Sequence, residues 1–191
     1  MRIEQTPLKD CFIIHEKVNG DERGNFIETF NQKDFLAATG LDIVFVQDNQ
    51  SRSSKGVLRG LHMQRGESAQ SKLVRVIEGA VLDVAVDLRK NSPSYGQHYS
   101  IELNTENHKQ FFIPAGFAHG FVVLSKQATF LYKVDKFYEP GNEVGLIYND
   151  KDLNIDWKLP ESELILSEKD KKLGTFAEYT ANFDQLENRK W

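Results

Sequence analysis

The sequence lacks the residues on which several classes of protein depend. It has one cysteine, Cys11, among 191 residues, which excludes an intrachain disulfide and a cysteine-ligated zinc site and is typical of a reducing compartment. No apolar run approaches the roughly 20 residues that cross a bilayer. The charged N-terminus, MRIEQTPLKDCFII, does not resemble a signal peptide. The formal net charge of −4 argues against a general nucleic-acid-binding protein.

What the sequence does contain favours β-structure. It has 13 phenylalanines, and the segment VLDVAVDL (81–88) alternates cleanly, with Asp83, Ala85 and Asp87 on the same face as Val81 and the remaining leucines and valines on the other. Turn signals separate these short segments and almost no helix lies between them, so the sequence predicts an all-β sandwich or barrel. Further strands are expected at 72–79, 99–104, 110–114, 120–125, 129–134 and 143–149.

The two ends of the chain differ from this strand-rich middle. Residues 11–30 predict two strands around the turn Asn19-Gly20-Asp21. Residues 31–39 predict a short helix that is capped by Asn31 and ended by Gly40. Near the C-terminus, the polar segments SEKDKKLGTFAEY (167–179) and NFDQLENRK (182–190) predict helices that pack on the outside.

The strand-like segment VLRGLHMQ (57–64) places Arg59 and His62 among apolar residues. A lone buried histidine is often a core residue with one satisfied nitrogen, but arginine is almost never buried unless it is paired. Strict alternation puts Arg59 and His62 on opposite faces, although a bulge at Gly60 would restore a shared face. Together with further polar residues on this segment and on the next two strand-like segments, they predict the lining of a pocket. Those further residues are Gln64, Lys72, Arg75 and Asp83.

Other candidates each have a plain structural reading beside the functional one. His119 follows a tight turn in IPAGFAHGF, and Tyr132 lies in FLYKVDKFY as an ordinary strand aromatic would. Ser167-x-x-Asp170 has the spacing of a helix capping box. A carboxylate at such a position can also use one oxygen to cap and the other to contact a second group.

Taken in order, seven segments resemble the dTDP-4-dehydrorhamnose 3,5-epimerase family, which consists of metal-free enzymes of the cupin superfamily. The resemblance covers the chain from about Asp21 to Asp170 and implies a cupin-type jelly-roll β-barrel with an N-terminal strand arm and short C-terminal helices. The segments are DERGNFIETF (21–30), QDNQSRSSKGVLRGLHMQ (47–64), QSKLVRVIEGAVLDVAVDLRKNSPSYG (70–96), FFIPAGFAHGFVVLS (111–125), YKVDKFYEPGNE (132–143), YNDKDLNIDW (148–157) and LSEKD (166–170).

The resemblance implies a role for each matching residue. His62 would be the general base, Asp170 would orient it, Tyr132 would be the general acid on the other side of the sugar, and Lys72 would stabilise an enolate oxygen. Histidine titrates near neutral pH and a tyrosine hydroxyl is protonated there, so both residue types suit proton transfer at carbons beside a ketone. The implied substrate-binding residues are Arg23, Phe26, Glu28, Gln47, Asn49, Arg59, His119, Tyr138, Glu143 and Lys169.

The resemblance also implies partners and organisation. The substrate would be a dTDP-4-keto-6-deoxyhexose on the way to dTDP-L-rhamnose or a related deoxysugar, and the protein a cytoplasmic homodimer that exchanges arms across its interface. We expect a single domain, with an arm and helix at about 1–45, a barrel core at about 46–150 and a tail at about 151–191. Many cupins bind a metal through an H-x-H pair, but here His62-Met63-Gln64 lacks the second histidine, so we expect no metal and no cofactor.

Other functions remain open from sequence alone. Relatives with the same base, acid and lysine invert only C3 or only C5 of the sugar. A cupin that binds a nucleotide sugar without catalysis and a metal-dependent cupin oxygenase belong to different functional classes. Sugar 3,4-ketoisomerases share the barrel but lack an equivalent of LSEKD, which favours an epimerase for this chain.

Overall fold

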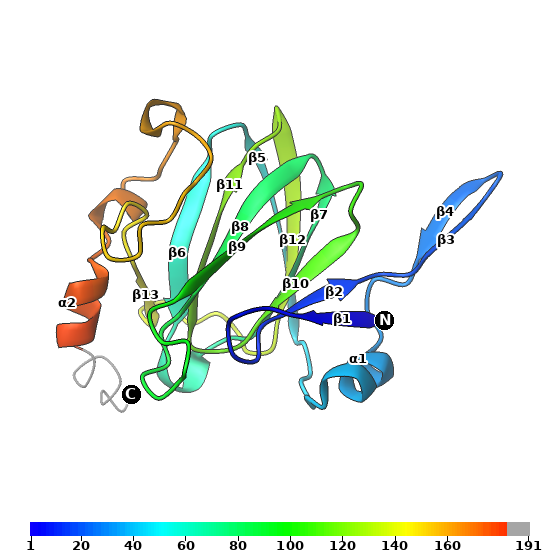
Figure 1. The fold of residues 1–191 in the computed structure, drawn as a ribbon, viewed down its shortest axis with the longest axis horizontal. Coiled ribbons are helices and arrows are strands. Elements are labelled where there is room, and N and C mark those ends of the chain that lie inside the picture. Colours follow the sequence, from blue (N-terminus) through cyan, green and yellow to red (C-terminus); the bar gives the residue numbers. More distant parts are fainter. Residues whose placement is uncertain (183–191) are drawn as a thin grey trace.

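A computed structural model describes residues 1–182 of the chain. Its body consists of two antiparallel sheets that face each other, as expected for a jelly roll (Figure 1). The six-stranded sheet has the order β1 (Arg2–Gln5), β2 (Phe12–His15), β10 (Lys109–Ile113), β7 (Lys72–Glu78), β12 (Gln127–Val134) and β5 (Gln47–Ser54). The five-stranded sheet has the order β13 (Glu143–Gly145), β6 (Leu58–Gln64), β11 (Phe117–Val123), β8 (Ala80–Asp87) and β9 (His98–Asn104).

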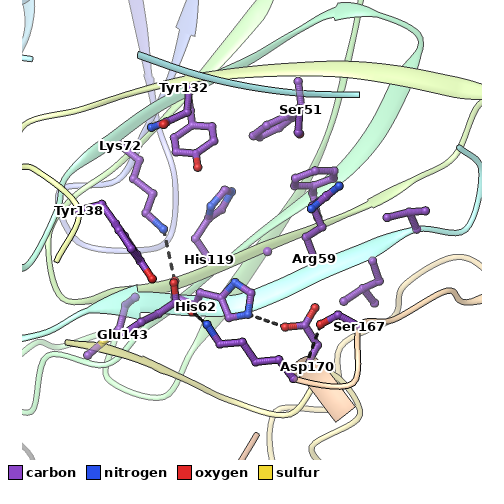
Figure 2. A pocket seen from close by; sticks show the side chains of 18 of the residues that line it. Ser51, Arg59, His62, Lys72, His119, Tyr132, Tyr138, Glu143, Ser167 and Asp170 are labelled. Carbon is purple, nitrogen blue, oxygen red and sulfur yellow. Dashed lines mark hydrogen bonds and ion pairs between the residues drawn. The ribbon is translucent and has the colours of Figure 1, made fainter. Parts of the chain in front are cut away.

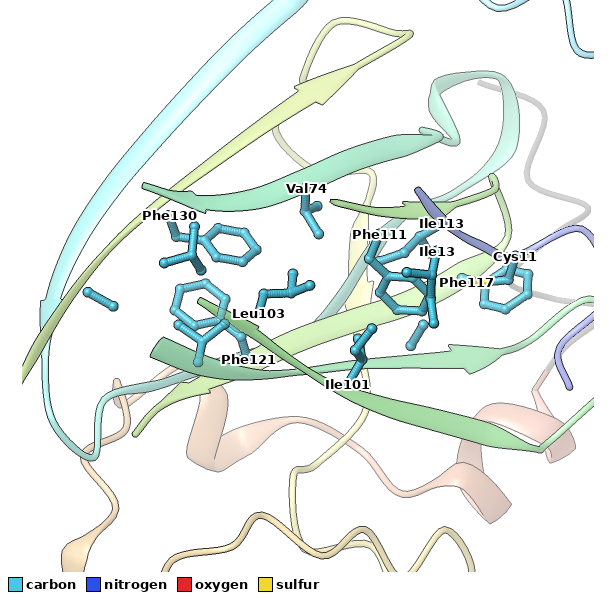
Figure 3. Packing of buried hydrophobic residues seen from close by; sticks show 14 of the residues in the cluster. Cys11, Ile13, Val74, Ile101, Leu103, Phe111, Ile113, Phe117, Phe121 and Phe130 are labelled. Carbon is cyan, nitrogen blue, oxygen red and sulfur yellow. The ribbon is translucent and has the colours of Figure 1, made fainter. Parts of the chain in front are cut away.

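The main core fills the space between the two sheets. Figure 3 shows its aromatic members, among them Phe111, Phe117, Phe121 and Phe130, all buried. Phe121 on one sheet stacks on Phe130 of the other with 4.3 Å between ring centroids. The stacked pair stabilises the packing of the two sheets through the apolar area that it buries and through its favourable ring geometry.

The alternation predicted for 81–88 is confirmed in β8, and both of its faces are buried. Val81 and Ala85 join the core between the sheets, whereas Val84 and Val86 join a second core beneath the C-terminal tail. The tail therefore covers a sheet face that would otherwise expose valines and leucines to water.

The N-terminal hairpin, β3 (Val18–Asp21) and β4 (Gly24–Ile27), projects away from the barrel as an arm (Figure 1). The turn predicted at Asn19-Gly20-Asp21 was placed too early, because the two-residue loop is Glu22-Arg23 and Asp21 pairs with Gly24. The Asp21 carboxylate accepts the Arg23 N–H at 2.9 Å, and Gly24 adopts φ +122°. This Asx turn fixes the reversal two residues later than composition suggested.

The predicted helix at 31–39 is confirmed as α1 (Gln32–Thr39). The Asn31 side chain accepts from the N–H groups of Lys33 and Asp34, and Gly40 ends the helix in the left-handed conformation. α1 seats Phe35 on Phe112 of β10, with 5.4 Å between the rings, and so covers part of the outer face of the six-stranded sheet.

The C-terminal tail contains less helix than the sequence predicted. Residues 167–179 form turns, the short 3-10 helix η3 (Asp170–Lys172) and α2 (Phe176–Ala181), where one continuous helix was expected. The other short 3-10 helices are η1 (Gly66–Ser68) and η2 (Glu161–Glu163). All of the predicted helix at 182–190 except Asn182 lies outside the described residues. Within residues 1–182, no helix is long and apolar enough to cross a membrane.

Candidate active site

A cavity of about 690 Å³ lies between the two sheets and is closed on one side by the tail. It gathers most of the polar residues singled out in the sequence (Figure 2). Ten of the fourteen predicted site residues line it: Asn49, Arg59, His62, Lys72, His119, Tyr132, Tyr138, Glu143, Lys169 and Asp170.

Arg59 and His62 share this cavity because β6 contains a bulge at Gly60. Opposite strand β11, His62 pairs with His119 and Arg59 pairs with Phe121, so β6 carries one extra residue. Gly60 has φ +124°, and a Cβ there would lie 2.5 Å from Cα of Gly120. The bulge considered in the sequence is therefore present, and only glycine fits its backbone.

His62 and Asp170 form a closely bonded pair. Nε2 of His62 lies 2.6 Å from Oδ1 of Asp170, and the carboxylate is buried, with a side-chain exposure of 5%. A neutral His62 donates Nε2–H to this carboxylate, which leaves Nδ1 on the cavity side as a free base (Figure 2). The arrangement has the geometry of an oriented general base.

The tail delivers Asp170 to this position by joining the edge of β6. Ile165 adds a parallel bridge to Val57, and its backbone bonds both Gly56 and Leu58. The Ser167 hydroxyl then accepts the Asp170 N–H at 3.1 Å. The predicted contact between Ser167 and Asp170 is present, but Ser167 is not a helix N-cap, because η3 begins at Asp170 with Lys169 before it and without a side-chain cap. The Asp170 carboxylate turns to His62.

A second histidine–carboxylate pair lies next to a buried lysine. His119 lines the cavity, whereas Asp83, which was predicted as part of the lining, lies behind it. Nε2 of His119 lies 3.0 Å from Oδ2 of Asp83, which is fully buried. Burial lowers the pKa of His119 despite this carboxylate. Burial also lowers the pKa of Lys72 to about 8, although the charges of Asp83 and Glu143 oppose the shift. Lys72 therefore remains largely protonated at neutral pH.

Tyr132 comes from the opposite sheet to His62. It lies on β12 of the six-stranded sheet, whereas His62 lies on β6 of the five-stranded one. Figure 2 shows its hydroxyl directed into the cavity from the far side. Burial raises the pKa of Tyr132, so its hydroxyl holds a proton throughout the neutral range.

One end of the cavity is built by the loop that carries Tyr138. The Gln64 side chain accepts the Glu139 N–H at 3.1 Å, and Gln47 accepts the Tyr138 N–H at 3.4 Å. An ion pair joins Lys169 to Glu143. Gln47 does not line the cavity itself, but its amide donates to Asn49, which does.

The remaining predicted residues lie far from this cavity in their own chain. Arg23, Phe26 and Glu28 belong to the arm or its base, and none lines the pocket. Phe26 is 70% exposed, and the described residues offer Arg23 only Asp21 of the same turn as a charged partner.

Arg75 was wrongly predicted as part of the pocket lining. Lys72 and Arg75 are three positions apart on β7, so their side chains point to opposite faces of the sheet. Arg75 lies on the outer face, where it contacts Glu16.

Sequence reasoning identified Gln64 as pocket lining but missed the apolar part of the wall. Gln64 lines the cavity, as predicted, and also holds the Tyr138 loop. Phe121, Phe130 and Leu166 supply apolar surface, and nothing in their local pattern distinguishes them from ordinary core residues. Within residues 1–182, no three or more histidine, cysteine or acidic side chains gather in a group that could hold a metal ion.

Comparison with known proteins gives consistent matches over nearly the whole chain. The family model described as dTDP-4-dehydrorhamnose 3,5-epimerase matches residues 5–178. The protein of that name from Escherichia coli is 51% identical over 178 residues, which cover 93% of this chain and 96% of the relative.

Solved structures also match this chain over nearly its whole length. A dTDP-4-dehydrorhamnose 3,5-epimerase from Elizabethkingia anophelis has a TM-score of 0.91 and 56% identity, and the match covers 93% of this chain and 97% of that one. A dTDP-6-deoxy-D-glucose-3,5-epimerase from Legionella pneumophila, in complex with dTDP-4-keto-L-rhamnose, has a TM-score of 0.91 and 46% identity, covering 100% of this chain and 98% of that one.

Proposed function

The chain belongs to the dTDP-4-dehydrorhamnose 3,5-epimerase family, and we propose that His62 and Tyr132 perform its proton transfers from opposite sides of the sugar. The protein is an isomerase that inverts C3 and C5 of a dTDP-linked 4-keto-6-deoxyhexose. The observation that carries the proposed roles is the origin of the two side chains in facing sheets. Inversion requires a base on one face of the carbon and an acid on the other.

Each inversion proceeds in two proton transfers. Nδ1 of His62 removes the proton from the carbon beside the C4 ketone, and the C–H electron pair forms the carbon–carbon double bond of an enolate. Asp170 stabilises the resulting imidazolium. The Tyr132 hydroxyl then donates its proton to the opposite face of the same carbon, and exchange with solvent restores both groups.

The negative charge that develops on the C4 oxygen is assigned to Lys72. Its ammonium group donates a hydrogen bond to the His62 carbonyl at 3.3 Å, and the residue as a whole is 9% exposed. A fixed cation in a cavity that excludes water stabilises an oxyanion more strongly than it would in solvent. We place His119 beside the sugar, where Asp83 fixes its ring.

We assign the nucleotide to the part of the cavity around Arg59 and to the arm of a second subunit. Arg59, which is anchored by the Ser53 hydroxyl at 3.3 Å, suits the diphosphate. Asn49, Tyr138, Glu143 and Lys169 line the same cavity, and Gln47 supports Asn49 from outside it.

We propose a homodimer in which each arm reaches the partner's pocket. This accounts for the exposure of Phe26 and for the separation of Arg23 and Glu28 from the cavity of their own chain. Because the arm, the barrel and the tail all serve one reaction, we propose that they form one domain. The free Cys11 and the nucleotide-sugar substrate support a cytoplasmic location.

The activity is tested by proton NMR of dTDP-4-keto-6-deoxy-D-glucose in D2O with the purified protein. Deuterium at both C3 and C5 is expected, and reduction of the product by a dTDP-rhamnose reductase confirms the double inversion. Deuterium at one carbon only would make the protein a single epimerase. A bound substrate with no deuterium at either carbon would leave a non-catalytic nucleotide-sugar-binding protein.

A further inference from the structure

The structure of the arm itself does little to fix the direction in which the arm points. It is a hairpin of two four-residue strands, and every residue of β3 is exposed. A two-stranded hairpin of this length is marginally stable in water. Figure 1 shows it standing clear of the barrel. Its orientation is therefore set where its two strands leave the body.

Both strands are held at that point by one side chain. The Gln110 amide on β10 donates one N–H to the Glu16 carboxylate, just before β3, and the other to the Thr29 carbonyl, just after β4. Arg75 on β7 approaches the same Glu16 oxygen at 3.5 Å. Gln110, Glu16 and Arg75 are called the arm-root clamp below.

Two members of the clamp, Gln110 and Glu16, are buried, which makes their bonds costly to lose, whereas the Arg75 side chain is 26% exposed. Gln110 is 3% exposed and the Glu16 side chain 5% exposed. Burial raises the pKa of Glu16 even with these donors present. Removing the amide leaves Arg75 as the remaining partner of the Glu16 carboxylate and takes a donor from the Thr29 carbonyl, so the root loses the one side chain that joins its two strands.

We propose that the arm-root clamp fixes the direction of the arm and thereby sets the affinity of the partner subunit's pocket for the nucleotide. Gln110 is its central positioning residue. The inference rests on the arm exchange proposed above. An arm that is held in place gives up little conformational freedom when substrate binds, whereas an arm freed at its root loses that freedom on binding and weakens it.

Two consequences distinguish positioning from general support of the fold. The clamp acts on substrate binding, so its loss raises KM and leaves kcat near its original value. It also acts in trans, because the arm of one subunit serves the pocket of the other. A local structural defect would instead affect the pocket of the chain that carries the substitution.

The first experiment measures kcat and KM of Gln110→Met, which keeps the volume and removes both donors. A rise in KM of about 5- to 20-fold is expected, within the usual range of coupling between sites. Gln127→Met is the matched control, because the Gln127 amide bonds Glu78 on the same sheet and not the arm. Glu16→Gln, which keeps an acceptor oxygen and loses the charge, replaces Gln110→Met if that variant does not fold, and a smaller rise is expected.

The second experiment uses mixed dimers with one working pocket. In a dimer of wild type with a His62→Ala, Gln110→Met subunit, the intact pocket receives the altered arm, and KM is expected to rise. In a dimer of Gln110→Met with a His62→Ala subunit, the intact pocket receives a normal arm, and KM is expected to match wild type. The reverse pattern, or no change in any clamp variant, overturns the proposal.

Arg23→Ala separates failure of the clamp from failure of arm exchange. If Arg23→Ala raises KM in trans and the clamp variants do not, the clamp proposal is wrong and arm exchange stands. If Arg23→Ala and the clamp variants all act only in cis, both proposals are wrong.

Discussion

Asp170 and His62 are 108 positions apart in the chain and lie 2.6 Å apart in the fold, Oδ1 to Nε2. The tail reaches the edge of β6 to make this contact, with Ile165 paired beside Val57. The proposed general base is thus oriented by a segment of the tail that forms no strand of either sheet.

Asp170→Asn tests the orienting carboxylate. The variant keeps the side-chain shape but removes the charge that stabilises the imidazolium, so kcat is expected to fall by about 100-fold or more. Steady-state kinetics measure this directly. Glu168→Gln is the control, because Glu168 is an exposed neighbour whose ion pair within residues 1–182 is with Lys171, and its kcat is expected to match wild type.

The lowered pKa of Lys72 predicts opposite pH trends for activity and stability. Its pKa of about 8 lies below the ordinary value of 10.5, so kcat/KM is expected to fall as pH rises through about 8. Between these two values the unfolded chain holds a proton that the folded one has released, so the Lys72 contribution to the free energy of unfolding increases with pH. Urea unfolding of wild type and Lys72→Met at neutral and alkaline pH measures this contribution. Equal pH slopes in the two proteins would contradict it.

Asp83→Asn is expected to move the alkaline limb of the activity profile to lower pH. The negative charge of Asp83 holds the pKa of Lys72 up against burial, so neutralising it lowers that pKa further. Asp87→Asn changes another fully buried carboxylate on β8, which is bonded to Arg89 and two serines. That control is expected to lose stability without moving the limb, and a limb unmoved in Asp83→Asn would refute the assignment.

Gly60→Ala tests the bulge that brings Arg59 and His62 together. The added Cβ meets Gly120 at 2.5 Å in a backbone with φ +124°, so a loss of about 3 kcal/mol or more in unfolding free energy is expected. Gly141→Ala has a comparable φ of +95° and open space around it, and about 1 kcal/mol is expected there. Denaturant unfolding compares the two, and equal losses would mean that the close approach to Gly120 is unimportant.

Local sequence patterns predicted the elements whose signals are themselves local. The caps Asn31 and Gly40 defined α1, and the alternation in 81–88 gave the two faces of β8. The hairpin turn was misplaced because the Asx bond from the Arg23 N–H to the Asp21 carboxylate outweighed the Asn-Gly signal.

Site residues could be predicted where the family resemblance, or the alternation of side chains along a strand, constrained their positions. Arg75 was misassigned because a charged residue near Lys72 in sequence was taken as near in space, whereas pleating separates them. The tail could not be predicted as it folds, because its conformation depends on pairing with the β6 edge far away in sequence. The arm-root clamp likewise joins residues whose only relation is tertiary.

The most direct test of opposed base and acid is deuterium exchange in D2O with His62→Ala and Tyr132→Phe, followed by NMR of the recovered sugar. Tyr132→Phe is expected to place deuterium at C3 or C5 of uninverted substrate, because the base still removes the proton and the acid no longer reprotonates the other face. His62→Ala is expected to give neither exchange nor inversion. Exchange that persists in His62→Ala, or that disappears together with inversion in Tyr132→Phe, would contradict the assignment of base and acid to facing sheets.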